Sequence, residues 1–344
     1  MRFNILDLIR FSAALGVVFY HYTSGESGAP FGVLAEFTKF GYLGVPLFFM
    51  ISGFVISASA LNRTPSEFVI SRLTRLYPTI FVCLTLTTLV ILTLGKDNIS
   101  LFQYLTNLTV LNLYAGQPFI DGVYWTLLAE LKFYFCVFLL LTAGWFHKFK
   151  IWLSIWMVMT ITFLLFKQPF FMGWFISPEY SAFFIAGVAF FMVTRQGYDK
   201  YYSGLLLLAL IVGLVRAYEQ AGSFLHDTTE ADRMIAVILT GGFFLLFYLI
   251  SIERVKIRGN SMILLLGGMT YPLYLLHSKV GSILEAQLRE YLNPHITVVF
   301  LVILMLFLSA MIHIYVERRY ANPIKIWLID RANSLKGEHI KVSS

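Results

Sequence analysis

Long apolar runs separated by short polar segments decide what this sequence can fold into. A run of about 20 apolar residues crosses a bilayer as an α-helix, because each residue adds about 1.5 Å across a hydrocarbon core roughly 30 Å thick. Apolar residues make up 58% of the chain and charged residues only 13%. Soluble proteins carry about 25% charged residues, so this chain has too little charge to cover a water-soluble domain. It is predicted to be one all-α integral membrane domain.

Ten apolar runs are predicted to form a polytopic bundle of transmembrane helices. Their approximate limits are 5–24, 40–61, 76–95, 123–143, 150–167, 178–194, 203–218, 233–251, 263–284 and 296–316. The first run holds Asp7 and Arg10 and lacks the small-residue cleavage site of a secretory signal. We therefore expect it to remain as the first span.

The distribution of positive charge predicts how the bundle is oriented. The net charge is +7, but the basic residues fall in small groups between apolar runs, which disfavours nucleic-acid binding. Most of these groups lie in segments on the same side as the N-terminus, so both chain ends are predicted to be cytoplasmic. The transmembrane domain is expected over 1–317, with a basic cytoplasmic tail over 318–344.

The first span carries the richest set of ionisable groups, which are costly inside a bilayer and therefore candidates for a site. Asp7, Arg10 and His21 lie on it, and 11 residues at about 100° each place Arg10 and His21 close to one helical face. Histidine takes and returns a proton near neutral pH. His21 is therefore a candidate general base, with an interfacial hydrogen-bonded histidine as the alternative.

Arg72 and Arg75 form a pair with i, i+3 spacing at the predicted cytoplasmic boundary. Guanidinium groups bind phosphates in a bidentate manner, so a phosphate-bearing cytoplasmic ligand fits this pair. The alternative is that both side chains extend to anionic lipid headgroups.

Further polar residues lie within apolar runs. Glu130 follows Trp125 in the fourth run, and either a catalytic role or a structural ion pair, for instance with Arg10, would explain it. Ser52 precedes Gly53 in the second run, where close helix packing is favoured over a nucleophilic role.

Late in the chain, a structural and a functional role for His277 are equally consistent with the sequence. His313 and Glu317, at i, i+4, are expected to pair structurally. No spacing of His, Cys and carboxylates predicts a metal site, and no phosphate-binding loop or dinucleotide motif is present.

Five segments, in this order, resemble the type 3 membrane acyltransferases. They are 6–10 with 19–21, the Phe-x-Met-Ile-Ser-Gly-Phe segment ending at Phe54, Arg72-Leu-Thr-Arg75-Leu-Tyr77-Pro78, Trp125-Thr-Leu with Glu130, and Tyr271-Pro-Leu-Tyr274 with His277. The resemblance implies an enzyme that moves an acyl group, most often acetyl, from cytoplasmic acyl-coenzyme A to a hydroxyl of an envelope glycan or lipid-linked glycan such as lipopolysaccharide. It implies location in a bacterial cytoplasmic membrane, contact with membrane lipids and no metal.

The resemblance also implies roles for individual residues. His21 matches the essential histidine, Arg10 its motif partner, and the segment with Arg72, Arg75 and Tyr77 the part associated with coenzyme binding. Glu130 matches a recurring acidic position. Some relatives carry a C-terminal esterase-like domain, for which residues 318–344 are too few, so a stand-alone membrane form is expected.

Two other functions remain open at this level. Intramembrane Arg, Glu and His are equally natural in a transporter or flippase of an envelope precursor. In a non-catalytic assembly partner, the same polar residues would hold helices together.

Overall fold

The computed structural model describes residues 3–24, 31–95, 97–168, 170–225 and 227–335. Helices account for nearly all of these residues, and no strand occurs among them. Within these ranges, eight helical segments are long and apolar enough to cross a membrane: 4–23, 33–60, 65–94, 122–142, 149–166, 200–224, 230–251 and 294–331. The prediction of a polytopic all-α membrane protein is therefore confirmed.

The main helices follow the predicted apolar runs closely. They are α1 (Asn4–Thr23), α3 (Gly44–Ala60), α4 (Pro65–Leu94), α6 (Trp125–Thr142), α7 (Phe149–Phe166), α9 (Pro178–Gln196), α10 (Lys200–Phe224), α11 (Glu230–Ser251), α12 (Ser261–Leu276) and α14 (Pro294–Ile312). Of these ten, α9 and α12 are not among the eight candidate spans. Nearly every residue of α9 is buried, because α9 lies inside the bundle among α3, α7 and α10.

The remaining helices are mostly short, except for the last one. They are α2 (Val33–Thr38), η2 (Lys39–Leu43), α5 (Leu101–Leu108), η3 (Asn112–Ala115), η4 (Gly122–Tyr124), α8 (Met172–Phe175), α13 (Lys279–Leu288), the π-helix η5 (His313–Glu317) and α15 (Arg318–Leu335).

The tightest helix packing joins α3 to α9, where two glycines face the opposite backbone. A Cβ on Gly53 would lie 2.2 Å from the Phe184 carbonyl oxygen, and one on Gly187 would lie 2.0 Å from that of Met50. Both glycines are therefore needed for this approach, as expected for Gly53 from the sequence. The crossing brings Ser52 into the centre of the bundle.

Helix α4 begins well before the predicted start at residue 76. Thr64 caps it by accepting a hydrogen bond from the Glu67 amide, while the Glu67 side chain accepts one from the Thr64 amide, and a proline occupies the first turn. The helix therefore begins about three turns earlier than predicted. Arg72 and Arg75 lie within these added turns, on one helix as their i, i+3 spacing predicted.

The prediction of one span over 263–284 is wrong, because the helix breaks after Leu276. Asp121, at the start of η4, is fully buried and accepts a hydrogen bond of 2.8 Å from the Lys279 amide, which starts α13. Tyr22 donates a hydrogen bond of 2.8 Å to the His277 carbonyl. These tertiary contacts fix His277 at the break between α12 and α13.

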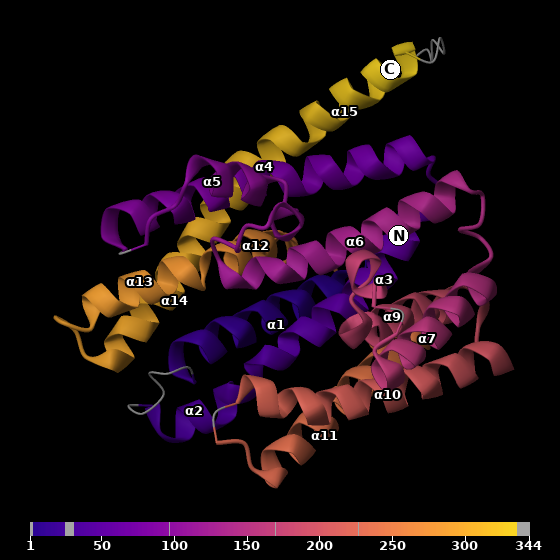
Figure 1. Cartoon of the computed structure of the whole chain (residues 1–344), viewed down its shortest axis with the longest axis horizontal. Coiled ribbons are helices and arrows are strands. Elements are labelled where there is room, and N and C mark those ends of the chain that lie inside the picture. Colours follow the sequence, from indigo (N-terminus) through magenta and orange to yellow (C-terminus); the bar gives the residue numbers. More distant parts are fainter. Residues whose placement is uncertain (1–2, 25–30, 96, 169, 226, 336–344) are drawn as a thin grey trace.

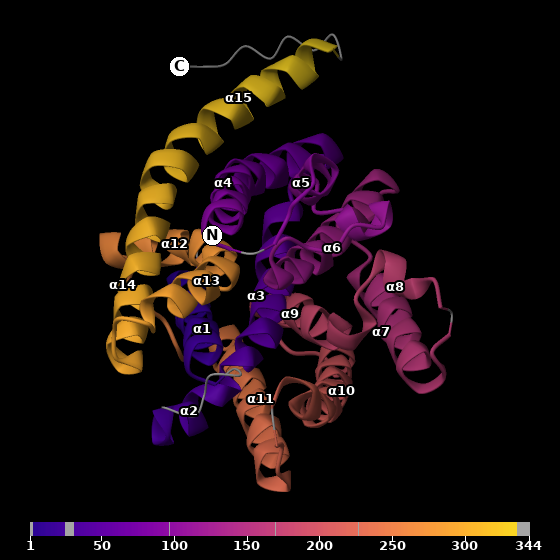
Figure 2. The ribbon, with the colours of Figure 1, turned by 60° about the vertical axis from the view of Figure 1, so that its left-hand side comes forward.

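The helix that contains the last apolar run continues beyond the predicted end at residue 316. The chain passes from α14 through η5 into α15, which Figure 2 shows as one long bent helix (yellow-orange) that extends past α4. α15 packs against α4, the helix that carries Arg72 and Arg75. Much of the predicted basic tail is therefore helical.

Candidate active site

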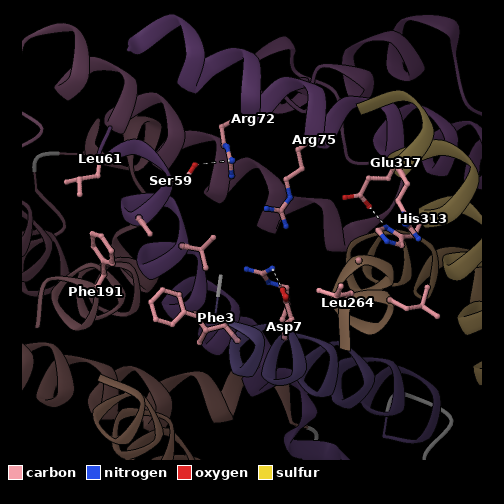
Figure 3. Close-up of a pocket in the computed structure, with 18 of the residues that line it drawn as sticks. Phe3, Asp7, Ser59, Leu61, Arg72, Arg75, Phe191, Leu264, His313 and Glu317 are labelled. Atoms are coloured by element: carbon pink, nitrogen blue, oxygen red, sulfur yellow. Dashed lines mark hydrogen bonds and ion pairs between the residues drawn. The ribbon is translucent and has the colours of Figure 1, made fainter. Parts of the chain in front are cut away.

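A cavity of about 1070 Å³ opens at the end of the bundle where α1, α4 and α12 begin and α3 and α9 end. Figure 3 shows Arg72 and Arg75 pointing into it from α4, with Asp7 opposite and His313 and Glu317 at one side. Six lining residues are arginines: Arg10, Arg63, Arg72, Arg75, Arg195 and Arg318. Asp7 and Glu317 are the two carboxylates in the lining, so the cavity is strongly positive. We call it the arginine cavity.

Arg72 is the most informative group in this cavity because it is only 7% exposed. Its Nη2 donates hydrogen bonds to the Ser59 and Ser71 hydroxyls at 3.2 and 3.1 Å. Its Nε and Nη1 are buried and have no hydrogen-bond partner among the described residues. A buried unpaired N–H is costly, and these donors are suited to an anionic group in the cavity.

Two side-chain pairs lie at the floor and side of the arginine cavity, an Asp7–Arg10 ion pair and a His313–Glu317 hydrogen bond. Asp7 and Arg10 approach to 3.8 Å on α1, and His313 Nδ1 lies 2.9 Å from Glu317 Oε2 in η5. The predicted pairing of His313 with Glu317 is thus confirmed. Both pairs pack closely against the middle of α12, where side chains on Gly267 or Gly268 would collide with Asp7 and His313.

A second, narrow cavity of about 100 Å³ continues from the first. Arg10, Arg72, Arg75 and Val55 line both cavities. Along α3 its lining runs from Ile56 to Val45, a distance of about 16 Å at about 1.5 Å per residue. We call it the narrow channel, and it leads away from the arginine cavity along the bundle.

Glu130 forms the polar centre of the narrow channel. Its Oε1 accepts hydrogen bonds of 2.7 Å from both the Ser52 and Tyr134 hydroxyls. The ion pair of Arg10 is with Asp7, so the pairing of Glu130 with Arg10 that the sequence left open is replaced by these hydroxyl contacts. Ser52 thus donates a hydrogen bond to Glu130, whereas the sequence favoured only a helix-packing role for it. The Tyr271 hydroxyl, also in this channel, is buried without a hydrogen-bond partner in the described structure.

His21 lies near the opposite end of α1 from Arg10 and lines neither cavity. Its ring packs against that of His277, with centroids 5.1 Å apart. His277 in turn contacts Tyr274, at 5.5 Å between centroids, and Tyr274 lines the narrow channel. The two histidines are therefore one aromatic ring away from this channel.

Two predicted site residues lie elsewhere. The Tyr77 hydroxyl donates a hydrogen bond of 3.3 Å to the Thr109 carbonyl, and Tyr77 lines neither cavity. Trp125 packs between the rings of Phe49 and Tyr180, at 6.0 and 5.0 Å between centroids. The structure gives neither residue a direct place in the cavities.

Several cavity residues were not singled out in the sequence. Tyr134 is one helical turn after Glu130, so its i, i+4 spacing was a usable signal. Arg63, Arg195 and Arg318 looked like topology signals only, and their convergence depends on the tertiary fold. No group of three or more His, Cys, Asp or Glu side chains within the described ranges could hold a metal ion.

Comparison with known proteins identifies the family of this chain. A family model described as an acyltransferase domain matches residues 3–314. Nodulation protein 10 of Rhizobium leguminosarum bv. viciae is 32% identical over 161 residues, which covers 40% of this chain and 44% of that relative. The chain thus spans less than half the length of this relative, and no solved structure matches. Because the family model covers nearly the whole sequence, the chain belongs to the type 3 membrane acyltransferase family.

Proposed function

We propose that the protein transfers an acyl group, in particular acetyl, from acyl-coenzyme A to a hydroxyl of an envelope glycan or lipid-linked glycan. Family membership supports acyl transfer. The observation that carries the choice of donor is the arginine cavity, with its six guanidinium groups and the unpaired buried donors of Arg72. Coenzyme A carries several phosphates, which are the groups that arginine clusters bind best.

The narrow channel supports a path for the acyl-bearing arm of this donor. Its mouth is shared with the arginine cavity, and its far part reaches Tyr274, next to the histidine pair. A phosphate end held by Arg72 and Arg75 would leave the thin arm pointing along this channel. Glu130 and Tyr271 offer a hydrogen-bond acceptor and donor along the way.

His21 is the proposed general base. The acceptor hydroxyl gives its proton to His21 as its oxygen attacks the thioester carbonyl carbon, so a C–O bond forms. Collapse of the tetrahedral intermediate breaks the C–S bond, and the imidazolium returns the proton to the leaving sulfur. The products are the O-acylated acceptor and free coenzyme A, and His21 regains its neutral form.

The acceptor is proposed to enter from the side opposite the arginine cavity. Arg10 and His21 are 11 residues apart on α1, or about 16 Å along the helix axis. With the arginine cavity on the cytoplasmic side, as the charge distribution predicts, His21 lies toward the outer face. This arrangement fits a bacterial cytoplasmic membrane, where the donor is inside and envelope glycans are assembled outside.

A labelling experiment tests this function. Purified protein in proteoliposomes is given acetyl-coenzyme A labelled in the acetyl group, together with an envelope glycan fraction. We expect label in the glycan with wild type, a loss of at least about 100-fold in rate with His21→Ala, and an unchanged rate with His147→Ala, which alters an exposed histidine. Absence of transfer by the folded wild type would favour a transporter, and full activity of His21→Ala would contradict the base assignment.

A further inference from the structure

His277 is a buried histidine with one nitrogen satisfied and the other free. The side chain is 0% exposed. Its Nδ1 lies 2.8 Å from the Tyr274 carbonyl oxygen, whereas its Nε2 is buried without a hydrogen-bond partner among the described residues. A buried polar atom left unpaired costs about 1–3 kcal/mol, so a role for Nε2 is needed to explain why it is kept.

The Tyr274 contact decides which nitrogen carries the proton. A carbonyl oxygen only accepts hydrogen bonds, so Nδ1 must donate and the neutral ring leaves a lone pair on Nε2. No carboxylate forms an ion pair with His277 in the described part of the chain, and a fully buried cation without such a partner is strongly disfavoured. His277 therefore presents a hydrogen-bond acceptor at Nε2.

His21 is the titratable side chain placed to use this acceptor. The two ring centroids are 5.1 Å apart at an interplanar angle of 56°. An N–H···N hydrogen bond of about 3 Å, together with the distance from each ring centre to its nitrogen, fills this separation. The spacing of the two rings therefore has room for one hydrogen bond from an N–H of His21 to Nε2 of His277.

We propose that His277 is the positioning residue of His21: it accepts a hydrogen bond from one nitrogen of His21 and so keeps the lone pair of the other nitrogen toward the acceptor hydroxyl. The inference rests on the proposed function, in which His21 is the base. The arrangement has the logic of a base oriented by a third group, with a neutral imidazole where other enzymes use a carboxylate.

The fold holds His277 in place independently of His21. Tyr22, next to His21 on α1, donates to the His277 carbonyl, and Asp121 holds the first amide of α13. Tyr124 donates to the neighbouring Leu275 carbonyl at 3.4 Å. The backbone at the break between α12 and α13 is thus anchored from α1 and from η4, and the Tyr274 carbonyl holds the imidazole through Nδ1.

Two variants separate an acceptor role from a packing role. His277→Gln keeps an oxygen acceptor near the position of Nε2, whereas His277→Leu has similar bulk and no acceptor. Rates are measured on the labelled acetyl transfer, with thermal unfolding in detergent as the check on folding and coenzyme A affinity by calorimetry as the check on the donor site. His147→Leu is the matched control.

We expect His277→Leu to lower kcat by about 100-fold or more without changing the KM for the donor, and His277→Gln to recover activity to within about tenfold of wild type. In a His21→Ala background, His277→Leu should cause no further loss, because it acts through His21. Equal rates for the Gln and Leu variants, or a further loss in the His21→Ala background, would overturn the inference. An inactive wild type, or a fully active His21→Ala, would instead overturn the proposed function.

Discussion

At the residue scale, burial leaves Arg72 with hydrogen-bond donors that no other described residue uses. The two serines that hold its Nη2 fix the guanidinium in the cavity wall, so the remaining N–H groups are oriented before a ligand arrives. Preorganised donors of this kind lose little side-chain entropy on binding. Snorkelling to lipid headgroups, which the sequence left open, does not fit a side chain that is 7% exposed.

Replacement of Arg72 should therefore weaken binding of the acyl donor rather than destabilise the fold. Hydrogen bonds to charged groups contribute about 1.5–3 kcal/mol, so Arg72→Gln is expected to weaken coenzyme A binding by about 10- to 100-fold. Arg72→Lys should recover only part of this loss, because lysine lacks the planar fork. Calorimetry with coenzyme A measures the effect.

The control for charge alone is Arg254→Gln, which removes one positive charge from an exposed loop outside both cavities. The affinity of the Arg254→Gln variant for coenzyme A should match that of the wild type. If Arg72→Gln bound coenzyme A as tightly as this control, the arginine cavity would not be the phosphate site.

At the element scale, the close crossing of α3 and α9 sets the position of α3, the helix that carries Ser52. Gly187→Ala would put a methyl group into the Met50 carbonyl, and backbone cannot move as a side-chain tip can. We expect a loss of about 1–3 kcal/mol, seen as a lower midpoint of thermal unfolding in detergent. Gly242→Ala on α11 is the control, since its added methyl group meets nothing within 4 Å; an equal effect in both variants would show that the crossing is not tight.

The elements also show which features the sequence could predict. Helices were predictable because apolar length is a local property, and the i, i+3 spacing of Arg72 and Arg75 correctly placed both on one face. The helix break at His277 could not be predicted from local sequence. It is stabilised by the hydrogen bond from the Lys279 amide to Asp121, which is 158 residues away in the chain. The bond between Ser52 and Glu130 joins residues 78 positions apart and was equally inaccessible.

At the scale of the whole molecule, the arginine cavity is built from both ends of the chain. Its lining comes from Phe3 at the start of α1 through to Arg318 at the start of α15. The arginine cavity can therefore form only when α1 and α15 have come together. It also lies at the end of the bundle that the charge distribution predicts to be cytoplasmic.

Cysteine labelling tests this orientation. Lys256→Cys and Asp227→Cys lie in loops at the two predicted faces, each in a background with Cys83 and Cys136 replaced by alanine. A membrane-impermeant maleimide applied to intact spheroplasts should label position 227 and spare position 256, and inverted vesicles should give the reverse. Labelling of position 256 from outside would put the arginine cavity on the wrong side for cytosolic coenzyme A.

Arg10, Arg72 and Arg75 line both the arginine cavity and the narrow channel. Under the proposed function, the side chains that would bind the phosphates of the donor also line the mouth of the channel that would hold its thioester arm. Binding energy from an unreactive part of a substrate can be used to align its reactive part. We therefore expect acyl-pantetheine, which lacks the nucleotide phosphates, to show a lower turnover as well as a lower affinity. No bound phosphate would then align its thioester in the narrow channel.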